Sequence, residues 1–319
     1  MTARPLGAPG DPLVSIGMPI WNCERTLRMA IRSIQEQTYR NWALLLVDDG
    51  SVDRTVQIAR SFEDPRIRVV SDGRHRGLSS RLNETILLSA GKYFARMDGD
   101  DVAYPERLER QVRYLELHPE VDLLGTGILV FKANGNVLGT RRIWRKHEQI
   151  CRRPLAGFYL PHPTWMGKTA WFNRHLYRDE ALRMEDQELM FRTYQSSRFA
   201  SLDEILVGYR EDRFGLKKAL IGRLHFMKMF ARLALAKPKG RNQSWAWGGV
   251  AEHGLKACVE VLAVATGQTY RILRQRALAV NTHELARWNR LWNQLTRGET
   301  GTDACGINSL KAIRCDPRT

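Results

Sequence analysis

Short apolar runs alternate with amphipathic segments along the first hundred residues. The runs have the length and residue types of buried strands, and the segments between them carry apolar residues at the spacing of one helix face. This pattern predicts strands at 13–19, 42–47, 67–70 and 92–97, separated by helices at 24–37, 53–62 and 77–90. Alternating strands and helices indicate an α/β protein with a mainly parallel central sheet that is covered on both faces.

Two of these strands end in acidic clusters. Asp48-Asp49-Gly50-Ser51 follows the second strand, and Asp98-Gly99-Asp100-Asp101 follows the fourth. Ligands of such sheets bind beyond the carboxyl ends of the strands, where both clusters are expected. Crowded carboxylates repel one another unless a cation lies between them, and oxygen ligands suit Mg²⁺ or Mn²⁺. Taken alone, the second cluster fits a solvated loop before a helix equally well.

Other nucleotide-binding patterns are missing from the sequence. No Gly-x-Gly-x-x-Gly follows the first strand, and Gly-x-x-x-x-Gly-Lys-Ser/Thr does not occur. A sheet without such a glycine turn has to neutralise phosphates by other means, and a metal held by the second acidic cluster would do so. The sequence also lacks the glycine-rich opening with Arg and Lys that is expected of a nucleotidyltransferase.

Charge divides the chain into two unequal parts. The net charge is +16 over 319 residues, and the stretch from residue 213 onward holds 19 Lys and Arg against 6 Asp and Glu. A polybasic region attracts polyanions, which here means nucleic acid or an anionic membrane surface. The five cysteines are scattered and form no Cys-x-x-Cys pair, which indicates a reducing compartment and argues against a zinc site or a disulfide framework.

Five ordered blocks resemble the inverting family 2 glycosyltransferases, which have the nucleotide-sugar-binding GT-A fold. The blocks are Pro19 with Trp21-Asn22, Asp48-Asp49-Gly50-Ser51 with Asp53, Gly77-Leu78-Ser79 with Asn83, Ala95-Arg96-Met97-Asp98-Gly99-Asp100-Asp101, and Glu185-Asp186-x-Glu188-Leu189-x-x-Arg192. The resemblance implies a GT-A domain at 12–212, with a nucleotide-sugar-binding half at 12–131 and an acceptor half at 132–212. An N-terminal tail at 1–11 would precede it, and a basic amphipathic helical extension at 213–319 would follow.

The resemblance implies a donor site for a nucleotide sugar, which is expected to be a UDP-sugar. Asp48 and Asp49 would face the nucleobase, where a carboxylate can accept the uracil N3–H. Pro19, Trp21 and Asn22 would line the base and the ribose. For Trp21, packing inside the protein is the alternative.

The second acidic cluster would hold the rest of the donor. Asp98 would approach the ribose hydroxyls, and Asp100, helped by Asp101, would hold a divalent metal, Mg²⁺ or Mn²⁺, against the diphosphate. Gly77 opens a predicted helix whose N-terminus favours phosphate. Arg81 lies one place before the position of the family's base-contacting arginine, so the sequence does not decide whether Arg81 contacts the nucleobase.

An inverting transfer needs a base, because the acceptor hydroxyl loses its proton as it attacks the anomeric carbon. The resemblance assigns this role to Asp186, near the start of a predicted helix at 182–194, where the helix dipole favours the ionised carboxylate. The alternative is a first-turn acid paired with an arginine. Glu185 would orient its neighbours or contact the acceptor. His162, between two prolines, is either a neutral imidazole facing the diphosphate or acceptor, or a packed core histidine.

The basic extension carries a second pattern. A predicted helix at 217–236 gathers five basic or titratable residues in one sector beside a wide apolar face: Lys217, Lys218, His225, Lys228 and Arg232. Such a helix is typical of a membrane interface, with Trp245 and Trp247 as aromatic anchors. Further helices are predicted at 250–266 and 272–295. The alternative is a helix that packs on the catalytic domain.

These patterns favour a cytoplasmic enzyme that is peripheral on the inner face of the cytoplasmic membrane. Its acceptor would be a saccharide or a lipid-linked saccharide in surface polysaccharide synthesis. A noncatalytic module that binds nucleic acid or membrane through the basic third is the alternative function. Nucleic acid is not the expected partner, because the sequence shows no recognisable nucleic-acid-binding module and no aromatic stacking platform among its basic residues.

Overall fold

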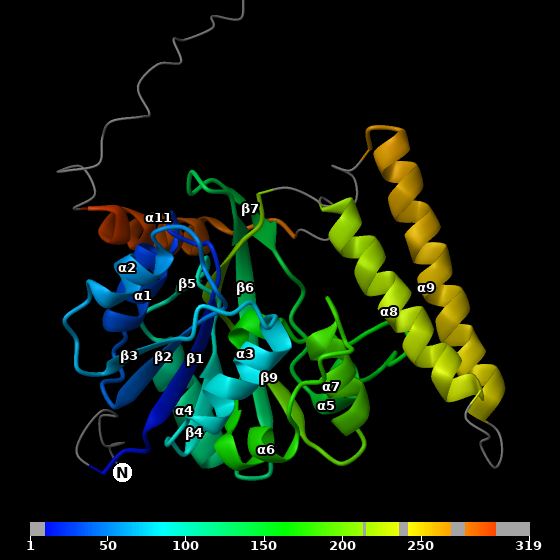
Figure 1. Ribbon diagram of the computed structural model, residues 1–319, viewed down its shortest axis with the longest axis horizontal. Coiled ribbons are helices and arrows are strands. Elements are labelled where there is room, and N and C mark those ends of the chain that lie inside the picture. The colour runs from blue at the N-terminus through cyan, green and yellow to red at the C-terminus, as the bar shows by residue number, and fades with distance from the viewer. Residues whose placement is uncertain (1–9, 213–214, 236–241, 269–277, 298–319) are drawn as a thin grey trace, which may run out of the picture.

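The computed structural model describes residues 10–212, 215–235, 242–268 and 278–297. Most of the predicted tail at 1–11 lies outside these residues. Within them, a central sheet carries helices on both faces, and a hairpin of two long helices stands to one side of it (Figure 1).

The elements follow one another along the chain in this order: β1 (Val14–Ile20), α1 (Leu27–Gln35), β2 (Trp42–Asp48), α2 (Thr55–Arg60), β3 (Ile67–Ser71), α3 (Leu78–Leu87), β4 (Tyr93–Arg96), β5 (Val102–Ala103), α4 (Arg107–Leu117), β6 (Leu123–Phe131), β7 (Val137–Thr140), α5 (His147–Ile150), the 3₁₀ helix η1 (His162–Thr164), β8 (Met166–Lys168), α6 (Thr169–Arg174), α7 (Glu185–Thr193), β9 (Phe199–Arg210), α8 (Leu216–Leu235), α9 (Asn242–Ala265) and α11 (Thr282–Thr296). Within the described residues, the predicted strands and helices are all present, and most of the helices are shorter than predicted. The start of the helix predicted at 272–295 lies outside the described residues. The helix α9 begins before the predicted start at 250.

The sheet has the strand order β3-β2-β1-β4-β8-β6-β9-β5, and β7 pairs with β6. The four predicted strands β3, β2, β1 and β4 are parallel to one another, and β6 is parallel to β9. In contrast, β5, β7 and β8 run antiparallel to their neighbours, so the sheet as a whole is mixed. The parallel half places the carboxyl ends of β1, β2 and β4 at one edge.

Burial explains why the first strands are apolar throughout. All seven residues of β1 are buried, because both faces of a sheet covered by helices are removed from water. Gly17 lies at the closest approach: a Cβ atom there would stand 2.5 Å from the Phe94 ring and 2.5 Å from Thr85 Oγ1. A glycine at this position lets α3 and β4 pack directly against β1.

The basic extension divides into two parts. The helix α11 packs on the sheet domain, where Trp288 is fully buried, lies 4.5 Å from the Phe131 ring and donates a hydrogen bond of 2.8 Å to Gly135 O. The hairpin of α8 and α9 is attached through buried Phe226 and Phe230, and Phe230 makes an edge contact with Phe191 of α7. Of the helices in the described ranges, none combines the length and apolar character needed to span a membrane.

Candidate active site

A cleft of about 490 Å³ opens at the carboxyl ends of β1 and β4. Its walls come from the loop after β1, the turn after β4 and the end of β9: Pro19, Ile20, Trp21, Asn22, Cys23, Glu24, Arg25, Thr26, Asp53, Asp98, Gly99, Asp100, Arg210 and Asp212. The structure therefore brings the predicted donor residues Pro19, Trp21, Asn22, Asp98 and Asp100 together in one cleft. We refer to it as the donor cleft.

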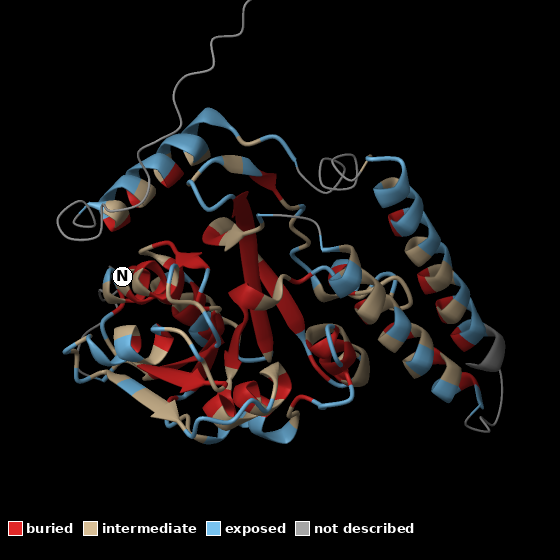
Figure 2. Ribbon diagram, turned by 45° about the horizontal axis from the view of Figure 1, so that its top comes forward, coloured by how far each residue is buried: buried red, intermediate tan, exposed pale blue. Residues whose placement is uncertain are grey.

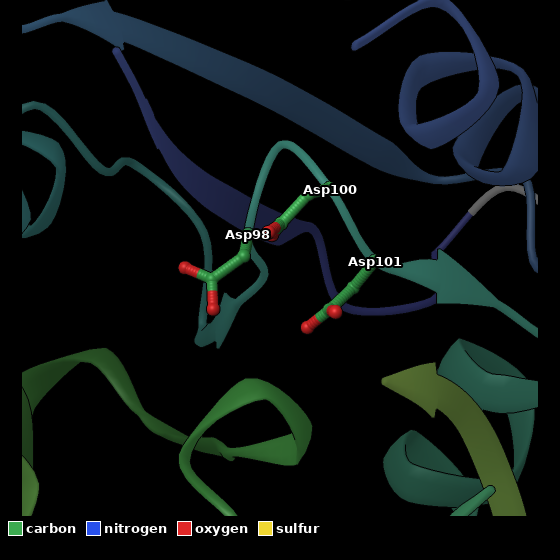
Figure 3. Close-up of side chains that lie close together, drawn as sticks. All are labelled: Asp98, Asp100 and Asp101. Carbon is green, nitrogen blue, oxygen red and sulfur yellow. The ribbon is translucent and has the colours of Figure 1, made fainter. Parts of the chain in front are cut away.

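Three carboxylate side chains extend from the tight turn between β4 and β5 (Figure 3). An oxygen from each of Asp98, Asp100 and Asp101 lies within 4.8 Å of the other two. Asp101 is buried, and its Oδ1 accepts a 3.0 Å hydrogen bond from the Arg210 backbone N–H. Its Oδ2 is also buried and has no hydrogen-bond partner in the part of the chain that the structure describes. An unpartnered buried oxygen beside two further carboxylates suits a hard divalent cation.

The charges around this turn are only partly compensated. The buried guanidinium of Arg96 lies 2.5 Å from Asp98 Oδ1, and Arg107 Nη2 donates to Arg96 O at 2.7 Å. Asp100 is the exposed member of the cluster, yet the protein around its carboxylate, together with the charge of Asp98, raises its pKa to about 6. Burial and the charge of Asp100 raise the pKa of Asp101 as well. A bound cation would relieve this repulsion.

The first acidic cluster is engaged within the protein. Asp48 is buried, and its two oxygens accept hydrogen bonds from Ser51 N at 3.1 Å and Ser71 Oγ at 2.8 Å. These bonds fix the turn after β2 to β3. The contact of Asp48 with a nucleobase stays a prediction.

Asp49 organises the start of α3. Its carboxylate accepts hydrogen bonds from the backbone N–H groups of Arg76 at 2.6 Å and Gly77 at 3.1 Å, and from Arg81 Nε at 3.1 Å. Gly77 has φ of +89°, a conformation that favours glycine. Arg81 is fully buried, so the position that the sequence left open is an internal partner of Asp49. The helix start predicted to favour phosphate thus already holds a carboxylate.

Asp49 also positions the aromatic side chains at the exposed edge of the donor cleft. His75 Nδ1 lies 2.9 Å from Asp49 Oδ2, and the His75 ring lies 4.9 Å from the ring of Trp21. Trp21 is 53% exposed, so the packing alternative for this residue does not describe its position. An exposed indole at a cleft offers a face on which a flat base can stack.

Asp186 lies apart from the donor cleft, in the first turn of α7, where it lines a second cavity of about 460 Å³. Gln187 Nε2 donates to Asp186 Oδ2 at 2.9 Å, and Gln187 Oε1 accepts from Phe158 N at 2.7 Å. Burial raises the pKa of Asp186. Arg96 interacts electrostatically with both Asp186 and Asp98, so one buried cation links the base candidate to the donor cleft.

Glu185 and His162 both have internal partners. Glu185 is buried and accepts a 3.0 Å hydrogen bond from Arg183 N, which stabilises the positive φ of +63° at Arg183. His162 Nε2 lies 2.7 Å from the hydroxyl of Tyr177. Burial, followed by the charge of Arg96, lowers the pKa of His162 well below its usual range, so its imidazole is neutral.

Comparison with known proteins identifies the family. Residues 15–180 match the family model described as glycosyl transferase family 2. The chain belongs to glycosyl transferase family 2. It is 38% identical over 214 residues to the putative glycosyltransferase EpsE of Bacillus subtilis, a match that covers 65% of this chain and 76% of EpsE.

Two further proteins resemble this chain. The chain is 37% identical over 102 residues to UDP-Glc:alpha-D-GlcNAc-diphosphoundecaprenol beta-1,3-glucosyltransferase WfgD of Escherichia coli, covering 32% of this chain and 40% of WfgD. The mannosyltransferase PcManGT from Pyrobaculum calidifontis, solved in complex with GDP-Man and Mn²⁺, has a similar fold. Its TM-score is 0.54 at 15% identity, covering 93% of this chain and 90% of PcManGT. The predicted GT-A fold and the predicted enzyme class, a glycosyltransferase, are confirmed.

The donor cleft of this family 2 glycosyltransferase contains a cationic residue, Arg210, that the sequence patterns did not indicate. Arg210 lies at the end of β9 and lines the donor cleft, where its Nε donates to Asp100 O at 3.1 Å. In the sequence, the only sign of this role was the position of the arginine at the end of an apolar run. The pairing of β9 with β5 brings it beside the acidic turn from a position 110 residues away.

Proposed function

We propose that this glycosyltransferase moves a sugar, with inversion, from a nucleoside diphosphate sugar to a hydroxyl group of a saccharide or lipid-linked saccharide in surface polysaccharide synthesis. The expected donor is a UDP-sugar, the donor named for WfgD. The observation that carries the proposal is the acidic turn at the donor cleft, with its unpartnered Asp101 oxygen, combined with Asp186 in a separate cavity.

Asp100 and Asp101, with Asp98, would hold Mg²⁺ or Mn²⁺ at the donor cleft. When bound, such an ion supplies positive charge that stabilises a departing diphosphate. The guanidinium of Arg210 adds fixed positive charge at the same place. Trp21 offers its exposed ring to the base, and Asp49 holds His75 against that ring.

Asp186 would take the proton of the attacking hydroxyl. Its raised pKa makes it a stronger base than an exposed aspartate. Gln187 holds one carboxylate oxygen, so the other can face the acceptor. Glu185 would act through the backbone, by fixing the turn that precedes Asp186.

Calorimetric titration tests the donor site. UDP, GDP, CDP and dTDP are titrated into the full chain with Mn²⁺ or with chelator, and into the Asp101→Asn and Asp186→Asn variants. We expect one nucleotide to bind only with metal, to bind far more weakly to Asp101→Asn, and to bind Asp186→Asn normally. If no nucleotide binds the wild-type chain with metal, the proposal is wrong.

We also propose that the hairpin of α8 and α9 docks this enzyme on an anionic membrane surface. Phe226, Phe230 and Ala234 of α8 are buried, so the apolar face predicted to enter the membrane is partly used for packing. The ribbon of the hairpin nevertheless carries long exposed stretches (Figure 2). Three exposed apolar side chains lie on α8, namely Leu224, Leu233 and Leu235, and a larger group lies on the second half of α9: Leu255, Val259, Val261, Leu262 and Val264.

The charge of the hairpin supports a membrane as the partner. Its described residues hold six Lys and Arg, among them exposed Lys217 and Lys218, against Glu252 and Glu260. Glu252 pairs with Arg153 and Lys256, and Glu260 with Arg223, so the uncompensated charge is positive. Basic residues beside exposed apolar ones are typical of interfacial helices.

Flotation with liposomes tests this docking. We expect the chain to float with vesicles of phosphatidylglycerol and phosphatidylcholine and to float less at high salt. Leu262→Asp should abolish flotation, whereas Leu117→Asp, on an exposed leucine of α4, should not. Concentration-dependent dimerisation without flotation would assign the same surface to a second copy of the chain, and retention on DNA or RNA alone would support the nucleic-acid alternative.

A further inference from the structure

The cavity that contains Asp186 has a lining unlike that of the donor cleft. Its residues come from the segment after β7, the segment before η1 and the start of α7: Arg141, Arg142, Trp144, Phe158, Tyr159, Leu160, Pro161, Asp186 and Gln187. Two arginines and three aromatic residues surround a single carboxylate. We call it the acceptor cavity, since the proposed base lies on its wall.

The two arginines leave positive charge available. Arg142 is exposed, with its guanidinium 5.5 Å from the ring of Trp144, and it forms no ion pair with the residues that the structure describes. Arg141 pairs with Glu211 at 2.5 Å through Nη2. Its Nη1 is buried without an acceptor among the described residues. An unpaired buried N–H donor is costly, and an anionic oxygen of a ligand would satisfy it.

The aromatic residues form a platform beside these charges. The rings of Trp144 and Tyr159 lie 6.0 Å apart, and Tyr159 is 50% exposed. Trp144 Nε1 is a second buried donor that finds no acceptor in the described structure. An exposed ring and a half-buried ring next to unpartnered donors suit a ligand with an apolar face and hydroxyl or anionic oxygens at its edge, which describes a sugar ring.

We infer that the acceptor cavity selects a saccharide that carries an anionic group, bound by Arg142 and Arg141, with its ring against Trp144 and Tyr159. This inference rests on the proposed function. The carboxylate of Asp186 repels an anion, so the charged group lies at the arginine end and the reacting hydroxyl at the Asp186 end. The anionic group has two possible sources: a phosphate ester, as in a lipid-linked saccharide, or the carboxylate of a uronic acid.

Ligand-observed NMR with three sugar probes tests the inference. The full chain is saturated with UDP and Mg²⁺ to fill the donor cleft, and dissociation constants are measured for N-acetylglucosamine, N-acetylglucosamine 1-phosphate and glucuronic acid. We expect one anionic probe to bind about tenfold more tightly than N-acetylglucosamine, the effect of one charge-assisted contact. The tighter anionic probe identifies the source of the charge.

Matched variants locate the effect. Arg142→Gln should bring the anionic probe to within about twofold of N-acetylglucosamine and leave the neutral probe unchanged, since only a charge is removed. Arg145→Gln, on an exposed arginine of the same segment that pairs with Asp203 at 3.0 Å, should keep the preference. Equal binding of all three probes to the wild-type chain, or equal weakening of all three by Arg142→Gln, would overturn the inference.

The UDP titration distinguishes a failure of this inference from a failure of the proposed function. If UDP binds with metal but no anionic preference is found, the inference fails and the proposed function stands. If UDP does not bind at all, the proposed function itself fails for that donor.

Discussion

Replacing Asp186 by asparagine tests the role of the general base separately from the binding of nucleotide and metal. The change keeps the volume of the side chain and an oxygen that can accept from Gln187 Nε2, so the local geometry should persist. It removes the carboxylate that would take the proton of the acceptor. We therefore expect kcat to fall while the affinity for the nucleotide stays within about twofold of wild type, because Asp186 lines the acceptor cavity and not the donor cleft.

The expected loss follows from the usual contribution of a general base. Such a group contributes about 10²- to 10⁴-fold in rate, which corresponds to about 3–5 kcal/mol of activation free energy. In the wild-type enzyme, activity should rise with pH as Asp186 ionises. Because burial raises the pKa of Asp186, this rising limb should lie above the ordinary aspartate pKa of about 3.9. The limb should be absent in Asp186→Asn.

Stability should change in the opposite direction from activity. A carboxyl group whose folded-state pKa is raised favours the folded state at low pH, and this contribution is lost as the pH rises from the unfolded to the folded pKa. At neutral pH, above the unfolded-state pKa, Asp186 therefore costs stability relative to low pH, and Asp186→Asn should unfold at the same or a higher temperature. A calorimetric scan at pH 7 measures this difference.

A radiolabelled sugar-transfer assay gives the rates, and Asp179→Asn is the matched control. Asp179 is exposed in the segment before α7 and accepts a 3.2 Å hydrogen bond from Ser80 Oγ, so its loss removes a charge without touching the cavity. Control activity should stay within about twofold. If Asp186→Asn keeps more than a tenth of wild-type kcat, or if it loses nucleotide binding as well, the assignment of the base is refuted.

Three further changes address the metal site and the packing. Asp101→Asn should weaken Mg²⁺-dependent nucleotide binding by about tenfold or more, measured by calorimetry, and unchanged binding would exclude Asp101 as a ligand. Trp288→Ala should cost about 3–5 kcal/mol of unfolding free energy in urea, because a fully buried indole is lost, and a change below about 1 kcal/mol would show that α11 is dispensable. Phe230→Ala should make the 216–265 hairpin sensitive to limited proteolysis, since it removes the contact with Phe191, and unchanged cleavage would contradict that docking.

Much of the donor cleft could be predicted from the sequence, because many of its residues directly follow the ends of predicted strands. A parallel sheet places consecutive carboxyl ends at one edge, so Trp21 and Asp98, which follow β1 and β4, had to lie together. The hydrogen-bond partners were not predictable in the same way. Asp49 is bound by the N–H of Gly77 and by Arg81, and these contacts depend on the conformation of the loop between β3 and α3. Arg210 reaches the cleft only through the pairing of β9 with β5.

The C-terminal third shows the limit of amphipathic patterns. Periodicity predicted helices there, but it did not say which apolar face is covered, because that depends on the partner. Phe226 and Phe230 of α8 are buried in the hairpin contact, whereas Val259 and Leu262 of α9 are exposed. Trp288 of α11 lies inside the sheet domain. The exposed apolar surface therefore extends to α9, a helix whose sequence pattern did not suggest it, beside exposed Leu224, Leu233 and Leu235 of α8.

The position of the hairpin connects the proposed membrane surface to the acceptor cavity. The helix α9 contacts the segment just before the cavity lining, where His253 Nε2 lies 2.8 Å from Leu155 O and Lys256 Nζ donates to Ala156 O at 2.9 Å. Another part of the cavity lining, Asp186, lies on α7, the helix on which Phe230 packs through Phe191. One helical hairpin thus contacts the elements that carry two parts of the cavity lining. An enzyme docked through this hairpin would keep the cavity at a fixed distance from the lipid surface, where a lipid-linked acceptor presents its sugar.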